Sequence, residues 1–63
     1  MAEGEMFYIT VLDGSLQLKR EGGTKVLKVF RSREEALQYA QVMMAKQRSS
    51  FRIQDRQGNW QTL

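Results

Sequence analysis

Residues 29–36 have the sequence Val29-Phe30-Arg31-Ser32-Arg33-Glu34-Glu35-Ala36, in which a strand-like apolar segment runs directly into the start of a helix. The hydroxyl of Ser32 can accept a hydrogen bond from the backbone N–H of Glu35, and the Glu35 carboxylate can reach back to the N–H of Ser32. This reciprocal pair, the capping box, stands immediately before an apolar run and therefore marks a helix start. It predicts a single helix over residues 33–48, with strands before and after it.

The predicted helix has one apolar face. At about 100° per residue, its apolar side chains fall within an arc of roughly 120°, with Tyr39 at the margin. This face consists of Ala36, Leu37, Ala40, Met43 and Met44. Because two of its members are small alanines, the helix should lie close against a sheet.

Four segments have the alternating pattern of half-buried strands, namely residues 7–12, 16–20, 25–30 and 51–55. Residues 60–63 are the candidate for a further short strand. Glycine-containing turns separate the first three segments, at Asp13-Gly14 and at Glu21-Gly22-Gly23-Thr24.

The expected fold is α+β, a small antiparallel sheet in the order β-β-β-α-β with one helix packed on one face. The third segment leaves its register open, because its faces Val26/Lys28/Phe30 and Lys25/Leu27/Val29 are equally mixed. The expected core is Phe7, Ile9, Val11, Leu16, Leu18, either Leu27 or Phe30, Ala36, Leu37, Ala40, Met43, Met44, Phe51 and Ile53.

The length and the composition of the chain argue against several classes of function. The 63 residues suffice for one domain, expected over residues 6–63, with residues 1–5 as a flexible tail. The sequence contains neither cysteine nor histidine, which removes the commonest metal ligands and general base. The carboxylates are accounted for by helix capping and turns, so we expect no enzyme, no metal site and no cofactor.

The sequence gives weaker indications of the location of the protein and of its partners. No basic leader and no apolar stretch of about 18 residues is present, so a cytoplasmic protein without a membrane partner is expected. The net charge of +3 is compatible with a polyanionic partner but is common among small domains.

Three stretches resemble a family of small bacterial and phage proteins of unknown function. They are Leu18-Lys19-Arg20-Glu21-Gly22, Phe30-x-Ser32-x-Glu34-Glu35-Ala36 with Ala40 after it, and Phe51-x-Ile53-x-Asp55-x-x-Gly58. The resemblance covers residues 8–61 and departs from the family pattern at Gln54, where histidine is frequent. It implies no activity and assigns no functional residue.

A weaker similarity extends from Val29 to Ala36 and is echoed at Tyr39-Ala40. It is to sheet-plus-helix DNA-binding domains of the plant AP2 and phage-integrase arm-binding type. In those domains the open side of the sheet enters the major groove, which implies a nucleic-acid partner. Similarity of layout does not by itself carry the function across.

The candidate binding site is the side of the sheet that the helix leaves uncovered. Cations that neutralise phosphates would alternate there with aromatic rings that stack on bases. The nucleic-acid-binding residues expected on this side are Tyr8, Lys19, Lys28, Arg52, Arg56 and Trp60. A one-layer sheet must also show water a polar face, and lysine and arginine there serve solubility equally well.

A protein–protein interaction module is the alternative function. Val42 lies opposite the apolar face of the helix, and together with Leu12, Trp60 and Leu63 it could form a patch for a homodimer or a host protein. Whether Trp60 belongs to the core or to a contact surface is left open by the sequence. The leading interpretation is a non-catalytic accessory protein, from a phage or a bacterium, that binds DNA or RNA through the uncovered side of the sheet.

Overall fold

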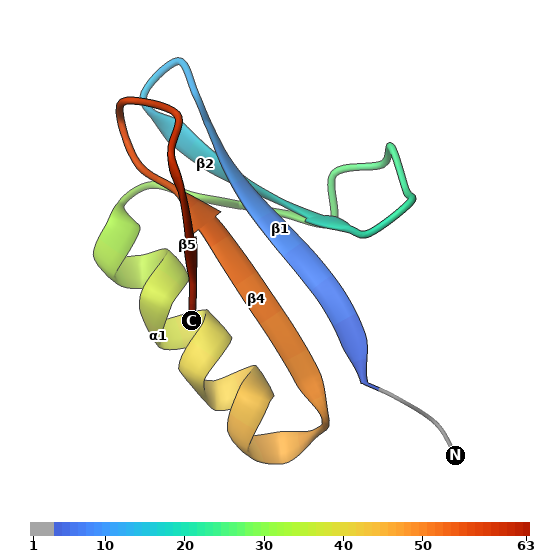
Figure 1. Cartoon of the computed structure of the whole chain (residues 1–63). Helices are drawn as coiled ribbons and strands as arrows, with labels where there is room; N and C mark the ends of the chain where they lie inside the picture. The colour runs from blue at the N-terminus through green and yellow to red at the C-terminus, as the bar shows by residue number, and fades with distance from the viewer. Residues whose placement is uncertain (1–3) are drawn as a thin grey trace.

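The computed structural model describes residues 4–63, which form one helix and five strands (Figure 1). In chain order the elements are β1 (Glu5–Leu12), β2 (Ser15–Arg20), β3 (Lys28–Phe30), α1 (Arg33–Lys46), β4 (Ser49–Gln54) and β5 (Trp60–Thr62). The α+β class and the helix packed on one side of the sheet are therefore confirmed, and the short fifth strand is present.

The sheet is mixed, with the strand order β3-β2-β1-β4-β5. Neighbouring strands are antiparallel except β1 and β4, which pair in parallel with Phe7 opposite Phe51 and Ile9 opposite Ile53. The purely antiparallel sheet expected from the sequence is corrected in this one pair. Because α1 carries the chain back along the sheet after β3, β4 enters beside β1 in the same direction as β1.

The capping residue predicted for the helix is confirmed. Ser32 is extended (φ −146°, ψ 160°), and its Oγ accepts a hydrogen bond from the Glu35 N–H at 3.2 Å. The other half of the capping box differs from the expectation, since Glu35 Oε1 accepts from the N–H of Arg31 at 2.8 Å and not from that of Ser32. At the other end the helix closes at Lys46, two residues before the expected boundary, with the Gln47 N–H donating to the Met43 carbonyl at 3.0 Å.

Loss of the capping hydroxyl should have a modest, measurable cost. Ser32→Ala leaves the Glu35 N–H without its side-chain acceptor, so the free energy of unfolding should fall by about 1 kcal/mol. Urea denaturation followed by circular dichroism measures this change. Ser50→Ala, at an exposed position of β4, is the matched control and should change the value by less than about 0.5 kcal/mol.

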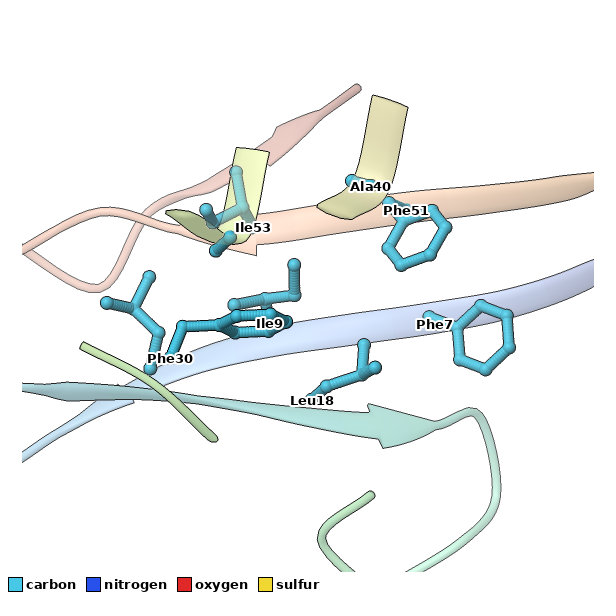
Figure 2. Packing of buried hydrophobic residues seen from close by; sticks show 9 residues of the cluster. Phe7, Ile9, Leu18, Phe30, Ala40, Phe51 and Ile53 are labelled. Atoms are coloured by element: carbon cyan, nitrogen blue, oxygen red, sulfur yellow. The ribbon is translucent and has the colours of Figure 1, made fainter. Parts of the chain in front are cut away.

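The core lies between α1 and the strands β1, β2, β3 and β4 (Figure 2). Its fully buried members follow the alternation of each strand and the small residues of the helix. They are Phe7, Ile9, Leu16, Leu18, Phe30, Ala36, Ala40, Phe51 and Ile53. Val11, Leu37, Tyr39, Met43 and Met44 are partly buried and pack around this cluster.

The pairing of β3 shows whether Leu27 or Phe30 belongs to the core, which the sequence left open. Phe30 is fully buried and Leu27 is 48% exposed, because β3 pairs Phe30 with Leu16 and so places the Phe30 side chain on the helix side. The strand is shorter than the expected residues 25–30. Ahead of it, the Leu27 N–H still donates to the Leu18 carbonyl at 2.7 Å.

Residues 4 and 5, which the sequence assigned to the flexible tail, contact the segment before β4. Glu5 is the first residue of β1, where its N–H donates to the Arg48 carbonyl at 3.2 Å and its carboxylate lies 3.5 Å from the Arg20 guanidinium. A side chain at Gly4 would collide with the Arg48 carbonyl. The remainder of the predicted tail, residues 1–3, lies outside the described part of the chain.

Candidate nucleic-acid interface

The side of the sheet turned away from α1 carries the candidate interface, and we call it the open face. Successive side chains of a strand point to opposite sides of the sheet. The neighbours in sequence of the buried strand residues therefore point away from the helix. The open face comprises Met6, Tyr8, Thr10, Leu12, Gln17, Lys19, Val29, Ser50, Arg52, Gln54, Trp60 and Thr62.

Two cations and an aromatic ring form one continuous row across the open face. Strand pairing places Lys19 of β2 beside Tyr8 of β1, and Tyr8 beside Arg52 of β4. Thr62 of β5 follows Arg52 at the end of the row. Cross-strand neighbours have Cβ atoms about 5 Å apart, so the row alternates charge and ring within the reach of one ligand.

Trp60 adds a second ring to the open face. It pairs with Gln54 on β4, and its ring centroid lies 5.5 Å from that of Tyr8 with the planes 75° apart. The two rings come from strands on either side of β4, so they meet over this strand. Trp60 is 46% exposed, and it therefore belongs to the surface and not to the core.

The structure brings together four of the six predicted binding residues. Tyr8, Lys19, Arg52 and Trp60 share the open face, as expected from the alternation of their strands. Arg56 is exposed and lies in the turn between β4 and β5, beyond the carboxyl end of β4. It lies outside the Lys19–Arg52 row, toward the start of α1.

The expected placement of Lys28 on the open face is wrong. β3 pairs Lys28 with the buried Leu18, so Lys28 lies on the helix side of the sheet. Its Nζ atom is 5.8 Å from the ring centroid of Phe30 and 5.7 Å from that of Tyr39. The ammonium group thus covers the edge of the aromatic core, a position where cation–π attraction is favourable.

Acidic side chains are placed away from the open face. Among residues 4–63, the acids lie on α1, in turns, or at Glu5 on the helix side of β1. Within this described part of the chain, the one ion pair joins Arg20 and Glu5. Lys19 and Arg52 therefore present their charges without an acidic partner from residues 4–63 at ion-pair distance.

A second group of cations surrounds a solvent-open cleft of about 580 Å³ at the start of α1. Arg31, Arg33 and Arg56 line it. Arg33 is already engaged, since it donates to Gln61 Oε1 at 2.7 Å and to the Gln54 carbonyl at 3.4 Å. The sequence alone did not reveal that Arg56 joins the two arginines at the helix start, because the turn after β4 determines its position.

The apolar residues of the alternative interface do not form one patch. Leu12 and Trp60 lie on the open face, whereas Val42 is on the exposed side of α1, across the sheet from them. Leu63 comes directly after β5 and continues its alternation, which places it on the helix side of the sheet. Its N–H donates to the Phe51 carbonyl at 2.9 Å. The structure instead puts exposed Val29 on the open face with Leu12 and Trp60.

The helix found in residues 4–63 is too short and too polar to cross a lipid bilayer. Comparison with curated proteins and with solved structures finds no match to either. Comparison with protein families does find one, over residues 8–62. This range includes almost all of the sheet, the whole helix and every residue of the Lys19–Arg52 row. The chain therefore belongs to DUF2188, a family of uncharacterised proteins conserved in bacteria.

Proposed function

We propose that this protein is a non-catalytic accessory protein that binds nucleic acid through the open face. One observation carries the proposal, namely the row in which Lys19, Tyr8 and Arg52 are cross-strand neighbours on a surface without described acids. Trp60 adds its ring to the same surface.

The chemistry of the row suits a nucleic acid in two ways. Lys19 and Arg52 can neutralise phosphates and release their counterions, which supplies affinity independent of sequence. Arginine also makes forked contacts to phosphate oxygens. Tyr8 and Trp60 offer ring surface to bases, and base–aromatic stacking tolerates every base because each base has a π-face.

The acids in the first turn of the helix lie away from the open face. Glu34 and Glu35 lie in the first turn of α1, on the side of the molecule that the helix covers. A polyanion bound to Lys19 and Arg52 of the open face is therefore kept away from these acids. A cytoplasmic location is part of the proposal, since nucleic acids are accessible there and a chain without cysteine is compatible with a reducing compartment.

Oligonucleotide binding measured over a range of salt concentrations tests the proposal. With Lys19, Arg52 and Arg56 as phosphate contacts, the logarithm of the association constant should fall against log salt with a slope between about −2 and −3. Fluorescence anisotropy of end-labelled oligonucleotides gives this slope. Absence of binding at low salt would end the proposal.

Charge-neutralising variants separate a local contact from the general effect of net charge. Lys19→Gln and Arg52→Gln should each flatten the slope by about 0.7 to 0.9. Lys46→Gln is the matched control, because it removes the same charge from α1 on the opposite side of the molecule. Equal effects of all three variants would show that the open face is not the contact surface.

Protein–protein interaction is the second candidate function. Leu12, Val29 and Trp60 are 52%, 55% and 46% exposed on the open face, which is apolar surface that a homodimer or a host protein could cover. Association through these residues should be nearly independent of salt, in contrast to phosphate binding. Light scattering at high protein concentration detects the homodimer directly. A monomer under these conditions would exclude the homodimer and leave a host protein as the partner.

A further inference from the structure

We infer that the open face takes a single-stranded nucleic acid, DNA or RNA, in preference to a duplex. The inference rests on the proposed function and specifies its ligand. It is carried by the width of the open face, by the number of its cations and by the position of its rings.

The open face is too broad to enter a duplex groove. The row from Lys19 to Thr62 crosses four strands, β2, β1, β4 and β5, so its outer strands lie about 14 Å apart. The major groove of B-DNA is about 12 Å wide and admits a helix or a two-stranded ribbon. The layout shared with groove-binding sheet domains therefore does not extend to a similar mode of docking.

The cations of the open face are too few to hold a duplex from outside. Lys19 and Arg52 are the two cations of the row. A protein that grips duplex DNA through its backbone can make about 6 to 10 phosphate contacts. Two cations match instead the few phosphates of a short single-stranded segment.

The rings lie where unstacked bases can reach them. Tyr8 and Trp60 meet over β4 in a nearly perpendicular arrangement, so neither ring covers the face of the other completely. Bases of a duplex are stacked on each other and are closed to a flat surface. Those of a single strand can be splayed onto sheet-borne aromatic residues, which typically accommodate two or three bases.

Trp60 supplies the probe for the test, because it is the one tryptophan of the sequence. The protein is titrated with oligo(dT), oligo(U) and a hairpin duplex, each of about 12 nucleotides per strand. Stacking should quench Trp60 fluorescence for the single strands. In competition against a labelled single strand, the hairpin should need at least about a tenfold higher concentration, a difference of roughly 1.4 kcal/mol.

The outcomes distinguish this inference from the proposed function. If the hairpin competes as well as the single strands, the inference is overturned while nucleic-acid binding stands. If neither class of oligonucleotide binds, both fall together. Single-strand binding that leaves Trp60 fluorescence unchanged overturns the stacking geometry.

Discussion

Phe51→Ala is expected to lower the free energy of unfolding by about 3–5 kcal/mol at 25 °C. Phe51 is fully buried at the centre of the core, with its ring centroid 5.0 Å from that of Phe7 and 6.5 Å from that of Tyr39. Truncation of a buried phenylalanine to alanine typically costs about 3–5 kcal/mol, through lost burial and the cavity left behind. A domain of this length has a total stability of only about 3–9 kcal/mol, so the substitution removes at least about a third of it.

Urea denaturation monitored by far-UV circular dichroism measures this loss. Phe51→Leu should be intermediate, since it keeps most of the apolar volume. Val42→Ala is the control, because Val42 is exposed on α1 and its truncation should change the stability by less than about 0.5 kcal/mol. A loss below about 1.5 kcal/mol for Phe51→Ala would show that the core is not organised around this ring.

Trp60→Ala should weaken binding of a single-stranded oligonucleotide by about 5- to 150-fold. The estimate corresponds to the 1–3 kcal/mol that one base–aromatic stack contributes. The effect on stability should be small, because Trp60 lies on the surface of a three-residue edge strand. Trp60→Phe keeps a ring at this position and should retain most of the affinity.

Anisotropy of a labelled single strand measures the affinity of both variants, since Trp60→Ala lacks the intrinsic fluorophore. Val42→Ala again serves as the control and should bind like the unaltered protein, because Val42 lies on α1, away from the open face. Unchanged affinity in Trp60→Ala would remove Trp60 from the contact surface. Urea denaturation of the same samples excludes unfolding as the cause of a loss.

Much of the fold follows from local signals in the sequence. The Ser32 cap places the start of the helix, and period-two alternation assigns Tyr8, Lys19 and Arg52 to one side of the sheet because β1, β2 and β4 each bury every second residue. These three strands are long enough for the pattern to be unambiguous. The central part of the candidate interface was therefore predictable.

The remaining features depend on pairing between distant segments. β3 has only three residues, and its pairing with Leu16 and Leu18 decides that Phe30 and Lys28 face the helix. The side on which Trp60 lies is fixed in the same way by its pairing with Gln54. The parallel contact of β1 with β4 arises from the return of the chain through α1, and no local motif encodes it.

The parallel contact between β1 and β4 has a consequence for synthesis on the ribosome. β1 can form a hairpin with β2 as soon as both have emerged, but its other edge stays unpaired until residues 49–54 have been translated. An open strand edge is a template for adventitious pairing with other chains. We expect the nascent hairpin to be most vulnerable to aggregation in this interval, which closes when β4 docks beside the first strand.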